Sequence, residues 1–201
     1  MLDIYVINLK ERLDRYKQIK ADFETYTNIN LIFIDAIKHE KGAIGCFLSH
    51  KKCISLAKEQ NMPYIIVLED DCLPGDNFEN RLINIVEYLK NNNDWKLFLG
   101  GVKKSNRIVY KCNSELEPIY TIKNGYCTHL SIYHHNIYDE VLQVNHIENC
   151  VDTYWHSRFL ALITLPFLAY QRNGYSDINN TYNNSMISGF QHTENILKKY
   201  I

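Results

Sequence analysis

Apolar residues follow two kinds of pattern over the first hundred positions. Four short runs are apolar at nearly every position, which is typical of strands buried on both faces of a sheet. These runs lie at residues 4–9, 31–34, 64–68 and 95–99. Between them, apolar residues recur every three or four positions, which predicts helices over residues 13–23, 43–60 and 78–89. Three successive strand–helix–strand units indicate an α/β fold with a mostly parallel sheet flanked by helices.

The pattern loosens after Gly101. We expect strands at residues 108–110, 118–120 and 129–133, and a short helix at 136–144. No linker, charge block or repeat divides the chain, so one domain over residues 1–201 is predicted. Its first part, about 1–101, is typical of a nucleotide-binding half, and the remainder, about 102–201, is a mixed half with room for a second substrate.

The amino-acid composition limits the classes of molecule that the protein is expected to bind. Hydrophobic residues make up 46% of the chain, and the formal net charge is −1. A nearly neutral chain exerts no general attraction on nucleic acid or anionic lipid, so a phosphate group would have to be bound by local side chains. We therefore expect no nucleic-acid partner.

The apolar stretches are too short to cross a membrane. The longest late one, residues 160–170, contains Pro166 and falls well below the roughly 20 residues that a spanning helix needs. The chain also begins without a basic leader or a cleavage site. We expect a cytoplasmic protein with no transmembrane segment, although peripheral membrane contact stays open. The six cysteines show no C-x-x-C pair, which favours reduced thiols.

Three carboxylates directly follow the apolar run at 64–68. They are Glu69, Asp70 and Asp71, and in strand geometry Glu69 and Asp71 would point to one side and Asp70 to the other. Adjacent carboxylates repel one another unless a cation compensates them, and oxygen-only ligands suit Mn²⁺ or Mg²⁺. This pattern predicts a cation site for a nucleotide diphosphate. The alternative is an acidic turn that leads into the next helix, with Asp76 or Asn77 as its cap.

The end of the first predicted strand carries polar and basic side chains. Asn8 leaves the sheet, and Arg12 lies near the start of the next helix, where Arg and backbone amides can bind phosphate. A solvated basic face is the alternative for Arg12. For Lys10 and Arg15 we favour that solvated face, with Arg15 paired to Glu11.

A glycine-containing segment begins the helix expected at 43–60. Gly45 permits close backbone approach, and Ser49 and His50 lie one turn further on. No Walker sequence is present, so the segment is a weak phosphate signal. His50 is predicted equally as a structural histidine and as a ligand.

The second half offers candidates for proton transfer. Asp152 is a candidate general base, because a carboxylate can take the proton of an attacking hydroxyl, and its alternative is a helix cap. Asp177 is the reserve candidate. His129 is predicted either as a core residue or as a metal ligand.

Taken together, these segments resemble glycosyltransferase family 25, which contains lipopolysaccharide and lipooligosaccharide galactosyltransferases and collagen galactosyltransferase domains. The matching segments run in the family's order across residues 4–178. They are Ile7–Arg12 with Asp14 and Arg15, Gly45–His50, Val67–Asp71, Thr128–His129, Val151–Asp152 and Ser176–Ile178. The chain is short for the family, and Thr128-His129-Leu130-Ser131 departs from its more usual T-H-A-Y.

The resemblance implies a GT-A-type domain with a D-x-D-like motif, here Glu69-Asp70-Asp71. It implies a UDP-sugar donor, most often UDP-galactose or UDP-glucose, with Mn²⁺ (or Mg²⁺) and inversion at the anomeric carbon. The second half would then be the acceptor side, with a glycan, glycolipid or protein hydroxyl as acceptor.

Site roles follow from the same resemblance. Metal ligands would be Asp71 with Glu69, and His129 as a third candidate. Donor contacts would come from Asn8, Arg12, Gly45, Ser49, His50, Glu69 and Asp70, and Asp152 would be the base. Two alternatives stay open: a non-catalytic module that binds a nucleotide sugar or glycan, and a sugar nucleotidyltransferase. The latter ordinarily has a glycine-rich loop after its first strand, and residues 8–12 contain no glycine.

Overall fold

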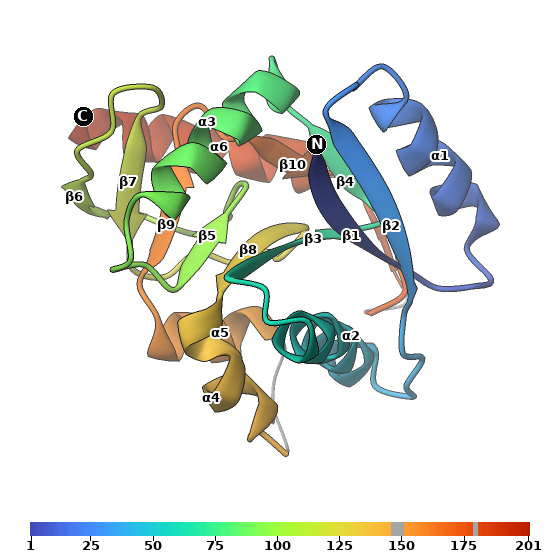
Figure 1. The fold of residues 1–201 in the computed structure, drawn as a ribbon. Coiled ribbons are helices and arrows are strands. Elements are labelled where there is room, and N and C mark those ends of the chain that lie inside the picture. Colours follow the sequence, from blue (N-terminus) through green and yellow to red (C-terminus); the bar gives the residue numbers. More distant parts are fainter. Residues whose placement is uncertain (146–150, 179–180) are drawn as a thin grey trace.

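A mixed sheet of eight strands lies at the centre of the fold (Figure 1). The computed structural model describes residues 1–145, 151–178 and 181–201. The strands of this sheet are β1 (Leu2–Asn8), β2 (Ile29–Asp35), β3 (Tyr64–Glu69), β5 (Leu97–Leu99), β6 (Ile108–Lys111), β7 (Ile119–Ile122), β8 (Leu130–His134) and β9 (Ala161–Thr164). Their order across the sheet is β2-β1-β3-β8-β5-β9-β7-β6.

The sheet is less parallel than the sequence pattern predicts. The contacts β1–β2 and β1–β3 are parallel, as expected for strand–helix–strand units. The contact β5–β9 is also parallel, although the sequence pattern predicts no strand at β9. β8, however, comes from the second half of the chain and lies between β3 and β5, antiparallel to both. β3 and β5 therefore run in the same direction, as predicted, but they are not neighbours, and the sheet is mixed.

Alternating side chains of the central strands enter two separate cores. Ile4 and Val6 of β1 belong to one core, and Tyr5 and Ile7 belong to the other. The same alternation recurs in β3, β5 and β8. Burial on both faces explains why these strands are apolar at consecutive positions.

Helices cover both faces of the sheet. They are α1 (Leu13–Phe23), α2 (Gly42–Glu59), α3 (Phe78–Lys90), α4 (Tyr138–Leu142), α5 (Val151–Arg158) and α6 (Met186–Leu197), with 3₁₀ turns η1 (His135–Ile137) and η2 (Lys198–Tyr200). α1 and α3 contribute to one core, and α2, α4 and α5 contribute to the other, on the opposite face in Figure 1. No helix of the described residues combines the length and apolarity needed to cross a membrane.

Among the described residues, four short strands lie outside the large sheet and form two antiparallel pairs. β4 (Cys72–Pro74) pairs with β10 (Ala169–Gln171), and β11 (Gly174–Ser176) pairs with β12 (Thr181–Asn183), both antiparallel. The first pair ties the segment after β3 to the late apolar stretch, which thereby lies beside the acidic residues. Five cysteines, at 46, 53, 72, 112 and 127, are free thiols, and Cys150 lies outside the described residues.

Candidate active site

Two cavities share the carboxyl end of β3. The larger has a volume of about 620 Å³ and the smaller about 480 Å³. Arg15, Cys46, Glu69 and Asp71 line both. Ligands of open α/β sheets bind beyond the carboxyl ends of strands, so the acidic residues stand where that rule places a ligand.

Asp71 has one carboxylate oxygen without a protein partner. Oδ2 accepts a hydrogen bond from Gln171 Nε2 at 3.0 Å. Oδ1 is buried and has no hydrogen-bond partner among the described residues. Burial, followed by the nearby charge of Glu69, raises the pKa of Asp71 to about 7, although Arg15 opposes this. A buried carboxylate with an unsatisfied oxygen carries a negative charge that its surroundings do not fully compensate, and a bound cation would compensate it.

Glu69 is held in its ionised form by donors. Its Oε1 accepts hydrogen bonds from Thr128 Oγ1 at 2.5 Å and from His50 Nε2 at 3.1 Å. Burial raises the pKa of Glu69, but the hydrogen bond and charge of His50 and the bond from Thr128 outweigh it, so the net pKa is lowered. Glu69 and Asp71 line both cavities, and Asp70 lines the smaller one as well. Residues 70 and 71 form a turn after β3, so the strand alternation expected for the triplet ends at Glu69.

This donor set fits an oxygen-preferring divalent ion. Two carboxylates line the same cavities, and one of them has a buried oxygen without a partner. The alternative, an acidic turn that leads into the next helix, holds in part, because residues 70 and 71 form a turn and Asn77 is the N-cap residue of α3. α3 begins at Phe78 after Asn77, whose side chain makes no capping hydrogen bond.

Asp70 is turned toward a different partner. Its Oδ1 accepts a hydrogen bond from Arg15 Nη1 at 2.6 Å, and its Oδ2 accepts one from Asn8 Nδ2 at 2.8 Å. The predicted solvated position of Arg15 is wrong: its side chain is only 14% exposed, and Glu11 pairs with Lys38 instead. Lys10, by contrast, is exposed and pairs with Asp35. Asn8 supports Asp70 and lines neither cavity.

Arg12 lines the larger cavity but is already paired. Its Nε donates to Asp14 at 3.0 Å, and Nη1 donates to Asp177. Asp177 also lies 3.8 Å from Arg15 Nη2 and lines the smaller cavity. Asp177 is thus held by two guanidinium groups and lines the smaller cavity, away from Asp152 in the larger one, so we keep it as the reserve candidate for a general base.

Gly45 and Ser49 fasten the loop after β2 to α2. Ser49 Oγ donates to Gly45 O at 2.7 Å and accepts from Ile37 N at 2.8 Å. A Cβ on Gly45 would lie 2.6 Å from Ile37 O, so only glycine permits this approach. Both residues line the smaller cavity, which the loop helps to shape.

Asp152 lies in the first turn of α5 and faces the larger cavity. Its Oδ2 accepts a hydrogen bond from Cys127 N at 3.2 Å, and its Oδ1 accepts one from Thr153 N at 3.1 Å. These bonds fix the carboxylate on the cavity wall that also holds Glu69 and Asp71.

His129 lies beside Glu69, whose backbone N–H donates to His129 O at 2.9 Å, but the His129 ring lies in the core. Its ring is fully buried against Phe190, at 5.0 Å between centroids, and it lines neither cavity. Burial lowers the pKa of His129 to about 4, so the ring is neutral near pH 7. His129 is a core residue here, and we leave it out of the metal site.

Sequence reasoning missed Gln171, Thr128 and the inward position of Arg15. Arg15 lies in the first turn of α1, three positions after Arg12, which immediately precedes the helix, and this short spacing is a usable signal that both guanidinium groups reach the same region, here Asp177. Gln171 reaches Asp71 only because β10 pairs with β4, a contact that no local pattern encodes.

These features define an α/β protein with an acidic ligand site at the carboxyl end of a central strand. Residues 40–147, more than half of the chain, match the sequence model of the family described as "Glycosyltransferase family 25 (LPS biosynthesis protein)". The chain belongs to glycosyltransferase family 25. The matched segment contains Gly45, Ser49, His50 and the acidic triplet.

Two relatives from Haemophilus influenzae agree with this. One, described as "Putative glycosyltransferase", is 30% identical over 150 residues, which cover 61% of this chain and 51% of the relative. The other, "Lipooligosaccharide biosynthesis protein lic2B", is 31% identical over 102 residues, covering 39% and 36%. The chain thus spans about half the length of the first relative and about a third of the second.

Among solved structures, the chain is similar to "A197 from STIV". The TM-score is 0.49 at 15% identity, covering 91% of this chain and 93% of that one. A likeness of this degree carries no conclusion about function.

Proposed function

We propose that the protein is a glycosyltransferase that moves a hexose, galactose or glucose, from a UDP-sugar to a hydroxyl group. Family membership supports the reaction class. The observation that carries the proposal is the pair Glu69 and Asp71 at the shared wall of the two cavities, with Asp71 Oδ1 buried and unpartnered.

We assign the nucleotide to the smaller cavity. Its wall contains Ile7 at the end of β1, Ala36 after β2 and Gly42 at the start of α2. Nucleotides in α/β folds bind at such strand ends, and backbone amides at a helix start favour phosphate. The larger cavity, which contains Asp152, would then hold the sugar and the acceptor.

Asp71 and Glu69 would hold the Mn²⁺ or Mg²⁺ ion that the family resemblance implies. Such an ion, when bound, neutralises charge on the departing diphosphate. Arg15 lies 3.6 Å from Asp71 and adds a fixed positive charge at the same wall. Lys103 and Lys104 line the larger cavity and supply further positive charge there.

Asp152 is assigned as the general base. It would accept the proton of the acceptor hydroxyl while that oxygen bonds to the anomeric carbon and the bond from that carbon to the diphosphate oxygen breaks. Attack on the face opposite the leaving group inverts the anomeric centre. Two backbone amides orient the Asp152 carboxylate for this role.

The acceptor is proposed to be a hydroxyl of a glycan, glycolipid or protein. The name of the lipooligosaccharide biosynthesis relative favours a glycan or glycolipid. Work on such an acceptor would bring the protein to the inner face of a membrane by peripheral contact.

Thermal stabilisation by donor tests the proposal. A ligand raises the melting temperature by mass action, so UDP-galactose and UDP-glucose should each be compared with UDP, GDP-mannose and CMP-sialic acid, with and without Mn²⁺. We expect a shift with a UDP-sugar that requires Mn²⁺. Equal shifts with all nucleotides, or none, would contradict the assignment.

Donor hydrolysis without an acceptor separates an enzyme from a binding module. A transferase releases UDP slowly because water replaces the acceptor hydroxyl. A binding module leaves the UDP-sugar intact however tightly it binds. UDP release that requires both Mn²⁺ and Asp152 is the expected result.

A further inference from the structure

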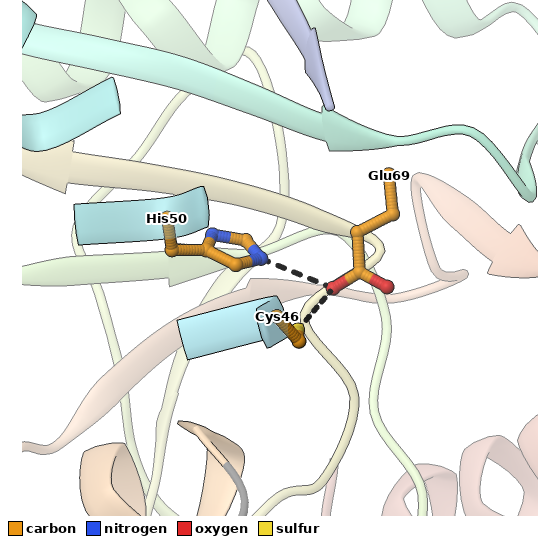
Figure 2. Close-up of side chains that lie close together, drawn as sticks. All are labelled: Cys46, His50 and Glu69. Carbon is orange, nitrogen blue, oxygen red and sulfur yellow. Dashed lines mark hydrogen bonds and ion pairs between the residues drawn. The ribbon is translucent and has the colours of Figure 1, made fainter. Parts of the chain in front are cut away.

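The start of α2 aims a thiol and an imidazole at one carboxylate oxygen. Figure 2 shows the side chains of Cys46 and His50 both directed at Glu69 Oε1. His50 Nε2 lies 3.1 Å from this oxygen, and Cys46 Sγ lies 3.9 Å from it. All three atoms lie within 4.8 Å of one another.

The spacing of these residues is that of a helical chelate. Cys46 and His50 are four positions apart, so they occupy one face of α2 a single turn apart. Glu69 then approaches from the end of β3. Two ligands from a rigid helix and one from a buried strand form a set whose geometry is fixed before any ion binds.

The far side of the His50 ring is also supported. His50 Nδ1 and the hydroxyl of Tyr133 are joined by a hydrogen bond of 2.9 Å. A metal-binding imidazole ordinarily has its second nitrogen held in this way, which orients the ring. The Tyr133 hydroxyl can accept from Nδ1–H, which leaves the Nε2 lone pair free to bind an ion.

The distances suit a small tetrahedral ion. Zinc bonds of about 2.0–2.3 Å to nitrogen, oxygen and sulfur place the ligand atoms about 3.3–3.6 Å apart. The separations of 3.1 and 3.9 Å from Glu69 Oε1 bracket this range, and the imidazole and the thiol lie within 4.8 Å of each other, so the three ligand atoms are close enough to draw together around one ion. Cys46 and Glu69 line both cavities, which leaves a fourth position accessible.

We propose that Cys46, His50 and Glu69 form a second metal site, with a preference for zinc-class ions over Mg²⁺ or Mn²⁺. Thiolate and imidazole ligands select Zn²⁺ and Co²⁺, whereas oxygen-only ligands select the harder ions. Binding is balanced by release of the Cys46 thiol proton to solvent and by movement of the His50 proton from Nε2 to Nδ1. Glu69 is common to this mixed set and to the oxygen set with Asp71.

Cobalt spectroscopy tests this site without any reaction. Metal-free protein in a phosphine reductant is titrated with Co²⁺ in the absence of nucleotide. We expect one Co²⁺ per chain, with a thiolate-to-cobalt charge-transfer band in the near ultraviolet and intense visible bands of a tetrahedral ion. Zn²⁺ should bleach both, since it binds such ligands more tightly than Co²⁺ does.

Matched variants locate the thiolate. Cys46→Ser should abolish the charge-transfer band, and His50→Gln should weaken Co²⁺ binding at least ~10-fold. Cys127→Ser is the control, because Cys127 is another thiol that lines the larger cavity. The charge-transfer band should persist in this variant. Absence of the band in the parent protein, or its persistence in Cys46→Ser, would overturn the proposal.

Asp71→Asn separates this site from the proposed donor site. The variant should keep the cobalt band, because Asp71 is not among the three ligands, while it loses Mn²⁺-dependent UDP binding. Loss of the cobalt band in Asp71→Asn would overturn the assignment of ligands. Failure of UDP to bind the parent protein would refute the proposed function and leave the cobalt result unaffected.

Discussion

The guanidinium of Arg15 bonds Asp70 rather than Asp71. Nη1 lies 2.6 Å from Asp70 Oδ1 and 3.6 Å from Asp71 Oδ2. Arg15 therefore neutralises the middle carboxylate of the triplet and leaves Asp71 to a cation. This division of three adjacent carboxylates supports the metal site that we propose for Glu69 and Asp71.

Removal of Arg15 should destabilise the protein. The Arg15 and Asp70 side chains are 14% and 9% exposed, so Arg15→Met leaves a buried carboxylate without its ion-pair partner. Breaking such a pair costs about 3–5 kcal/mol. Urea unfolding at pH 7 would measure it, with Lys10→Met as the control, since the exposed Lys10–Asp35 pair contributes about 0–1 kcal/mol. Equal losses in the two variants would contradict this account.

Ionisation of Asp71 should lower the stability of the metal-free protein as the pH rises from about 4 to 7, a contribution opposite in sign to that of His129 over the same range. Asp71 has a folded pKa of about 7, above its ordinary value of 3.8, so the unfolded chain releases this proton first. Ionisation then favours unfolding until the folded pKa is passed, by a few kcal/mol at most. Asp71→Asn should therefore melt higher than the parent at pH 8 without metal, although it loses Mn²⁺-dependent UDP binding. A lower melting temperature for the variant at pH 8 would contradict the raised pKa.

Asp152→Asn should separate donor binding from transfer. The amide keeps an oxygen that can accept the backbone hydrogen bond, but it cannot take a proton, so transfer should fall ~10²–10⁴-fold. Asp177→Asn is the comparison, because Asp177 is held by Arg12 and Arg15. Parental transfer rates in Asp152→Asn, with Mn²⁺-dependent UDP binding intact, would exclude Asp152 as the base.

His129→Leu should improve acid stability and keep metal binding. The folded pKa of His129 is about 4, below its ordinary value of 6.5, so the unfolded chain takes up the proton first as the pH falls. Protonation of His129 therefore lowers the stability of the parent by about 3 kcal/mol between pH 6.5 and 4, and a leucine removes this contribution. Melting curves at pH 5 and pH 7.5 would show it. Loss of Mn²⁺-dependent UDP binding in this variant would instead restore His129 as a ligand.

The sequence predicts the central strands and the acidic triplet well, because both leave local signals. Consecutive apolar positions in β1 and β3 reflect burial on both faces, and Glu69 and Asp71 follow β3 directly. The partners of a strand leave no such signal. The insertion of β8 between β3 and β5 depends on pairing across more than 60 residues, which periodicity does not encode.

In the candidate site, too, some residues could be predicted from local sequence signals and others could not. Asp152 and Asp71 stand out as carboxylates at element boundaries, and the fold brings both to one cavity. His129 stands out equally, but its ring is buried against Phe190 in the core, a long-range contact that the local sequence does not encode. The contact of Gln171 with Asp71 depends on the pairing of β4 with β10, so the sequence alone does not predict it.

A crystal structure with UDP and Mn²⁺ tests the central claim most directly. We predict the ion on Asp71 and Glu69, the pyrophosphate bound to that ion, and the uridine in the smaller cavity beside Ala36 and Gly42. A nucleotide bound elsewhere, or an ion that touches neither carboxylate, would contradict the account.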